Sequence, residues 1–274
     1  MSLPSPAPSE SNPAGDAPTP ERPTGAARLG NDVVDLRHPR CRSRPEGDRL
    51  PLRILTLDEM EWFAEPSDPR SRLRRLWALW AAKETAFKVV SKVAGRPPVF
   101  RHQAFAAQLD ESMDGSGITS YAGQVEWAGL RCRVEGMATE QFLHLVGWNE
   151  PPGQTRPPRV ELGVEGFGAT DLQELPNDEE RRRGVRGPLS LRARRVASAR
   201  LASYLDRDRS GTTTKPSFQR IRIITSSERP GRAPPRVWVD GEPRPDLDLT
   251  ISHHGRYVGW AFLLPSPGPE AVKD

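Results

Sequence analysis

The chain has 274 residues, 35% hydrophobic and 28% charged, which supports one large domain or two of ordinary size. Its net charge of +4 suits a phosphorylated cofactor, an acidic protein or a nucleic acid equally well, so charge excludes none of them. No apolar run is long enough to cross a membrane, and the N-terminal MSLPSPAPSE has no secretory-signal pattern. Two scattered cysteines, Cys41 and Cys132, argue against a disulfide scaffold and against a zinc site. We therefore expect a cytoplasmic protein.

The first predicted elements follow a tail. Residues 1–28 are rich in Pro, Ala, Ser and Gly and are predicted to be disordered. A first α+β half is predicted over 29–150. Its elements are a strand at 29–36, a helical turn at 58–65, a long helix at 70–94 and strands at 99–109, 121–136 and 141–148.

A Pro-rich linker over 151–159 leads to a second half, 160–264, before a tail at 265–274. The second half contains an Arg-rich helix at 189–205 and strand candidates at 219–225, 236–239 and 247–264. A helix followed by three strands, twice, favours a duplicated α+β unit. We expect a pseudodimer of two similar halves, each a helix packed on an antiparallel sheet.

Charge interrupts the apolar stripe of the long helix. Lys83 takes the stripe position between Trp80 and Phe87, and Glu84 and Lys88 lie beside it. One interpretation is an exposed Glu84–Lys88 pair, with Lys83 reaching the surface along its stem. The other is a polar site between two packed layers, with a carboxylate for metal binding or proton transfer.

Two apolar strands also carry polar residues. Asp32, at the start of the first strand, is either a turn cap or an oxygen ligand for Mg²⁺. Near the C-terminus, Ser252, His253 and His254 form either a polar turn or a small phosphate pocket built from the serine, a histidine N–H and backbone amides. Because adjacent strand residues point to opposite faces, a metal site made of His253 and His254 is not expected.

Together, these segments resemble the 4′-phosphopantetheinyl transferase superfamily. GNDVVDL at 30–36 is similar to its Gly-x-Asp strand, and WAAKETAFK at 80–88 to its Trp-x-x-Lys-Glu-x-x-x-Lys helix. ISHHGRYVGWAF at 251–262 is similar to its Ser-His strand, and GRAP at 231–234 to its Gly-Lys-Pro turn. The resemblance spans residues 30–262.

The resemblance implies transfer of the 4′-phosphopantetheine group of coenzyme A to a serine of an apo carrier protein, with Mg²⁺ and release of adenosine 3′,5′-bisphosphate. Asp32 and Glu84 would bind Mg²⁺, Glu84 would act as or position the base, and Lys88 would stabilise the phosphate or the leaving group. The residues implied to hold coenzyme A are Lys83, Arg232, Ser252 and His253. The resemblance also implies a fused, monomeric pseudodimer with its site between the halves.

The sequence departs from the family pattern in two ways. A second acid expected two residues after Asp32 is replaced by Val34, and the Ser-His segment follows the acidic strand instead of preceding it. The main alternative is a non-catalytic relic of the same fold that binds coenzyme A or a carrier protein. The Arg-rich helix lacks the interleaved aromatic residues typical of nucleic-acid binding, so we expect no nucleic-acid partner.

Overall fold

The computed structural model describes residues 26–42, 48–151, 158–208, 220–225 and 234–264. Most of the predicted N-terminal tail, most of the predicted linker and all of the predicted C-terminal tail lie outside these ranges. No helix within the described ranges has the length and apolar character needed to cross a membrane.

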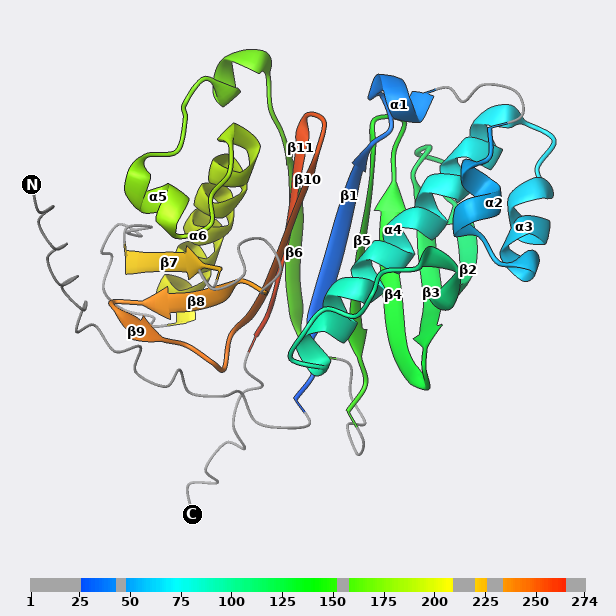
Figure 1. The fold of residues 1–274 in the computed structure, drawn as a ribbon. Coiled ribbons are helices and arrows are strands. Elements are labelled where there is room, and N and C mark those ends of the chain that lie inside the picture. Colours follow the sequence, from blue (N-terminus) through cyan, green and yellow to red (C-terminus); the bar gives the residue numbers. More distant parts are fainter. Residues whose placement is uncertain (1–25, 43–47, 152–157, 209–219, 226–233, 265–274) are drawn as a thin grey trace, which may run out of the picture.

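The first part of the structure is one antiparallel sheet with helices on one face (Figure 1). Its elements are β1 (Leu29–Asp35), α1 (Pro39–Arg42), α2 (Leu50–Ile54), α3 (Leu57–Ala64), α4 (Pro69–Val93), the 3₁₀ turn η1 (His102–Ala104), β2 (Ala106–Met113), β3 (Thr119–Trp127), β4 (Leu130–Ala138) and β5 (Phe142–Asn149). The strand order is β1-β5-β4-β3-β2, so the first strand of the part pairs with the last one.

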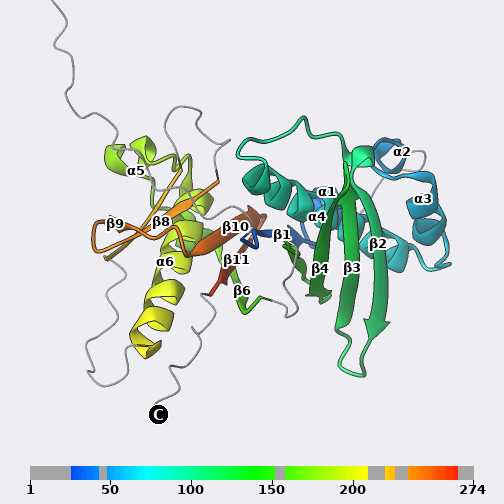
Figure 2. The same ribbon diagram turned by 90° about the horizontal axis from the view of Figure 1, so that it is seen from below.

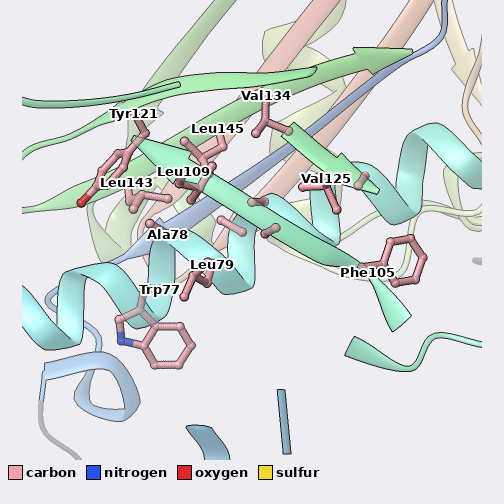
Figure 3. Close-up of a cluster of buried hydrophobic side chains, with 14 of the residues drawn as sticks. Trp77, Ala78, Leu79, Phe105, Leu109, Tyr121, Val125, Val134, Leu143 and Leu145 are labelled. Atoms are coloured by element: carbon pink, nitrogen blue, oxygen red, sulfur yellow. The ribbon is translucent and has the colours of Figure 1, made fainter. Parts of the chain in front are cut away.

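Helix α4 is the main helix on this sheet. It begins at Pro69, where the Asp68 carboxylate caps it by accepting the backbone N–H groups of Arg70 and Ser71. It ends before Gly95, whose positive φ of 69° suits a residue without a Cβ. Its buried face joins strand residues in an apolar cluster, which Figure 3 shows around Trp77, Leu79, Leu143 and Leu145.

Gly30 brings β1 close to α4. A Cβ at this position would lie 2.2 Å from the backbone oxygen of Thr85, so only glycine permits this spacing. Asp32 therefore sits on a strand held tightly against the helix that carries Glu84.

The second part contains two small antiparallel sheets and one long helix. Its elements are β6 (Val160–Gly166), η2 (Ala169–Leu172), α5 (Asp178–Arg182), α6 (Pro188–Asp208), β7 (Ile221–Ile224), β8 (Arg236–Val239), β9 (Glu242–Pro243), β10 (Asp248–His254) and β11 (Tyr257–Leu263). The sheets are ordered β10-β11-β6 and β7-β8-β9, and α6 packs against β7, β10 and β11.

The two parts meet where β1 lies beside β10, with α4 and α6 on either side (Figure 2). The Leu29 N–H donates to Asp248 Oδ2 at 2.6 Å, and Thr250 Oγ1 donates to Asn31 Oδ1 at 2.9 Å. Ala261 and Leu29 also share one small apolar cluster. The acidic strand and the histidine strand are therefore neighbours, although more than 200 residues separate them in the chain.

The predicted α+β class is confirmed, whereas some strand boundaries were wrong. The single strand predicted over 121–136 is two strands, because Ala128 and Gly129 form a turn with φ of 47° and 83°. The strand predicted at 99–109 begins only at Ala106, and β6 was not predicted at all. The likeness of the two halves as a pseudodimer stays a prediction.

Candidate active site

A cavity of about 1210 Å³ opens between the two parts. One wall is the C-terminal half of α4, with Glu84, Lys88 and Lys92. The opposite wall contains the start of α6 with Arg194, together with His253 of β10. Residues from elements far apart in the sequence thus face one shared space.

Asp32 and Lys88 form an ion pair beside this cavity. Lys88 Nζ lies 3.0 Å from Asp32 Oδ1 and also donates to the backbone oxygen of Asn31 at 2.6 Å. Both side chains are largely buried, with exposed fractions of 27% for Lys88 and 15% for Asp32. These contacts hold Lys88 against the strand that contains Asp32. They favour a polar site between two packed layers over an exposed Glu84–Lys88 pair.

Glu84 lies one helical turn before Lys88, and its side chain has no hydrogen bond or ion pair with the rest of the described chain. Burial first and the Asp32 carboxylate second raise the pKa of Glu84, Lys88 lowers it, and the net result is a pKa of about 7. The Glu84 carboxylate is thus close enough to Asp32 and Lys88 to interact with the charges of both, and it titrates near neutral pH.

His253, from the second part of the structure, lines the same cavity as Glu84. Its side chain is exposed to the cavity, yet the surrounding protein lowers its pKa, through burial first and then through the positive charges of Lys88 and Arg194. The imidazole is therefore neutral at pH 7, within electrostatic range of both cations.

Arg194 is a cation without a carboxylate partner among the described residues. Its guanidinium donates to Ser190 Oγ at 2.6 Å and otherwise meets only neutral oxygens, while its buried Nε has no partner. Burial lowers the pKa of Arg194, and no acid opposes this effect. Such a group favours an anion in the cavity.

Comparison with known proteins finds similarity over part of the chain. Residues 28–127 match the family model described as the 4′-phosphopantetheinyl transferase superfamily. Over these residues the chain is similar to this superfamily. A holo-[acyl-carrier-protein] synthase of Shewanella denitrificans is 36% identical over 74 residues, which are 27% of this chain and 56% of that protein. The chain thus matches only about half the length of this relative.

The matched region of the phosphopantetheinyl transferase superfamily contains Asp32, Glu84 and Lys88, which the structure brings together. His253 and Arg194 lie outside it but share the cavity. Val34, which replaces the second acid, is buried in the apolar core. Arg232 lies outside the described residues, so its placement stays a prediction.

The structure places Lys83 away from the cavity, which corrects the expectation that it holds coenzyme A. Its side chain is fully buried, 2.7 Å from Glu59 Oε2, and it also donates to the backbone oxygen of His102. Glu59 in turn accepts the backbone N–H groups of Thr56 and Ala107, so every charge of this pair is compensated. The Thr56-x-x-Glu59 pattern is a helix-capping signal in the sequence, and it could have predicted a structural role for Glu59 at the start of α3.

The structure also corrects the expectation that Ser252 and His253 form one phosphate pocket. Ser252 lies on the opposite face of β10 from His253, buried close to His144, and its hydroxyl has no partner among the described residues. A phosphate pocket shared by Ser252 and His253 is therefore not formed, because strand alternation separates the two side chains. His254 also points away from the cavity and accepts the Asp35 N–H through Nδ1.

Proposed function

We propose that this protein transfers the 4′-phosphopantetheine group of coenzyme A to a serine of an apo carrier protein, with Mg²⁺, releasing adenosine 3′,5′-bisphosphate. The observation that carries the proposal is the cluster of Asp32, Glu84 and Lys88 beside a large cavity, within the region that matches the superfamily. The proposed acceptor is a carrier protein of the acyl, polyketide or peptidyl type.

The residues present fit a bound Mg²⁺. Oxygen ligands are what this ion prefers, and one or two carboxylates plus substrate phosphates usually hold it. Glu84 has no partner within the described chain and is destabilised as an anion by Asp32, and a divalent cation between the two would relieve this repulsion. When bound, Mg²⁺ would neutralise charge on the pyrophosphate of coenzyme A.

The side chains then have complementary roles in the transfer. The serine oxygen attacks the phosphorus that bears the pantetheine arm, and the bond from this phosphorus to the adenosine bisphosphate oxygen breaks. Glu84 takes the serine proton directly or positions the group that does, which suits a carboxylate with a pKa near 7. Lys88, held by Asp32, offers its charge to the phosphate or to the leaving group.

The second part supplies the cofactor end of the proposed site. Arg194 offers a positive charge with no carboxylate partner among the described residues, and it shares the cavity with Lys88 and His253, so the cavity suits a ligand with more than one phosphate. The cavity volume of about 1210 Å³ is above the usual range for drug-sized ligands, which accords with a larger molecule such as coenzyme A. Arg232 remains a further proposed contact.

The test is incubation of the full chain with coenzyme A, Mg²⁺ and a panel of apo carrier proteins, followed by intact mass spectrometry. We expect at least one carrier to gain one phosphopantetheine group on its serine, and no gain without Mg²⁺ or without coenzyme A. Tight coenzyme A binding with no modified carrier across acyl, polyketide and peptidyl types would instead support the non-catalytic relic.

A further inference from the structure

Three metal-ligating side chains meet at one end of the contact between the two parts. His38 follows β1, Cys41 lies in α1 and His254 ends β10, and one ligand atom from each lies within 4.8 Å of the others. The two imidazole ring centroids are 5.0 Å apart. Cys41 is buried and both histidines are half-buried, so solvent reaches the cluster past the histidine rings.

We propose that His38, Cys41 and His254 form a zinc-binding site, separate from the carboxylate pair at the cavity. A thiolate and two imidazoles are typical zinc ligands, whereas Mg²⁺ prefers the oxygen ligands that this cluster lacks. Tetrahedral Zn²⁺ holds such ligand atoms about 3.4–3.6 Å apart, given bond lengths of about 2.0–2.3 Å. A contraction of roughly 1 Å therefore closes the site, with water at the fourth position.

The local backbone positions the three ligands. The Cys41 N–H donates to the His38 oxygen at 2.8 Å, so the turn places His38 and Cys41, three residues apart, on one side. The Asp35 N–H donates to His254 Nδ1 at 3.0 Å, and the Asp35 carboxylate accepts a hydrogen bond from Arg256 in the turn between β10 and β11. Asp35, the last residue of β1, thus holds the β10–β11 hairpin in place beside His38 and Cys41.

Zinc binding changes the protonation and the hydrogen bonds of the three ligands. Cys41 releases its thiol proton to solvent and binds as the thiolate. A coordinating imidazole nitrogen must offer its lone pair, so His254 exchanges or loses the hydrogen bond from the Asp35 N–H, and His38 the one from the Arg40 N–H to its Nδ1. The loss of two hydrogen bonds is small compared with the binding free energy of a structural zinc site.

This inference goes beyond the proposed function and does not depend on it. His38 and Cys41 belong to the first part and His254 to the second, so the ion would join the two parts. It also revises the sequence-based expectation of no zinc site. That expectation rested on local cysteine spacing, and the third ligand lies more than 200 residues away in the chain.

The test is titration of the untagged, metal-free full chain with Co²⁺ and with Zn²⁺, in excess Mg²⁺ to fill the carboxylate site. We expect one tightly bound ion per chain and a near-ultraviolet thiolate-to-cobalt charge-transfer band, which Zn²⁺ abolishes. Absence of this band from the wild-type protein overturns the proposal, whatever the variants do.

Matched variants assign the ligands. Cys41→Ser should abolish the cobalt band and weaken zinc binding at least about tenfold, whereas Cys132→Ser, which alters an equally buried cysteine on β4, should retain both. His254→Gln should weaken zinc binding similarly, and the neighbouring His253→Gln should not. Glu84→Gln should leave zinc binding unchanged, which separates this site from the proposed catalytic one. Equal loss of zinc in the Cys41 and Cys132 variants, or retention in both, contradicts the assignment.

Discussion

Lys92 of α4 and Asp248 of β10 form a buried ion pair across the contact between the two parts, with Nζ 3.1 Å from Oδ1. Their side chains are only 6% and 8% exposed. The ammonium also donates to the backbone oxygens of Leu29 and Leu249, so this one lysine contacts both neighbouring strands. A charge pair so deeply buried should matter more for the fold than any pair on the surface.

We predict that Lys92→Met destabilises the protein by about 3–5 kcal/mol, because it removes the ammonium that lies 3.1 Å from the buried Asp248 carboxylate. Urea unfolding followed by tryptophan fluorescence measures the loss. Arg131→Ala is the control, since it removes an exposed pair with Glu126 and should cost under about 1 kcal/mol. Similar losses in the two variants would show that the Lys92 pair does not hold the parts together.

We predict that Glu84→Gln abolishes transfer to the carrier protein while the fold survives. The glutamine retains the shape but loses the charge that metal binding and proton uptake require. Intact-mass assays measure transfer, and circular dichroism with thermal unfolding checks the fold. Turnover close to wild type in this variant would remove Glu84 from the mechanism.

The pKa of Glu84 predicts a pH dependence of stability without metal. Because its pKa rises from 4.5 to about 7 on folding, the folded state keeps a proton that the unfolded chain has lost. The resulting stabilisation is complete below pH 4.5 and is lost as pH rises through 7. Relative to Glu84→Gln, the wild type should therefore lose on the order of 2 kcal/mol between pH 5 and about pH 8.

Urea unfolding of both proteins in a chelator, at the two pH values, measures this difference. Adding Mg²⁺ at pH 8 should restore stability to the wild type but not to Glu84→Gln, because only the carboxylate pair binds the ion. A difference between wild type and variant that stays constant with pH would contradict the raised pKa.

We predict that His253→Ala raises the KM for coenzyme A and leaves kcat nearly unchanged. A hydrogen bond to a charged phosphate contributes about 1.5–3 kcal/mol, roughly a 10- to 150-fold change in affinity. His254→Ala is the control for coenzyme A binding, since His254 points away from the cavity to the Asp35 N–H. A fall in kcat at constant KM would place His253 in the transition state.

Arg194→Gln should weaken coenzyme A binding at least about tenfold, because its buried guanidinium lacks a carboxylate partner among the described residues. Arg195→Gln, one residue along the same helix, is the control, since Arg195 pairs with Glu174 and Glu180. Calorimetric titration at low and high salt measures both. Equal effects in the two variants would mean that only general positive charge matters.

The sequence by itself determined the α+β class and the residue types of the candidate site. Asp32, Glu84 and Lys88 could be named as candidates because short local patterns contain them, namely a strand start and one helix face. Local patterns also located the long helix, since its stripe, its N-terminal proline and its terminal glycine act within a few residues of each other.

Only the tertiary structure decided which polar residues meet. Lys83 and Lys88 look alike in sequence, yet packing turns one into the core beside Glu59 and the other towards Asp32. Arg194, the Lys92–Asp248 pair and the His38–Cys41–His254 cluster each depend on contacts between the second part of the chain and the first. Periodicity shows which face of an element a residue occupies, whereas long-range packing determines what lies opposite that face.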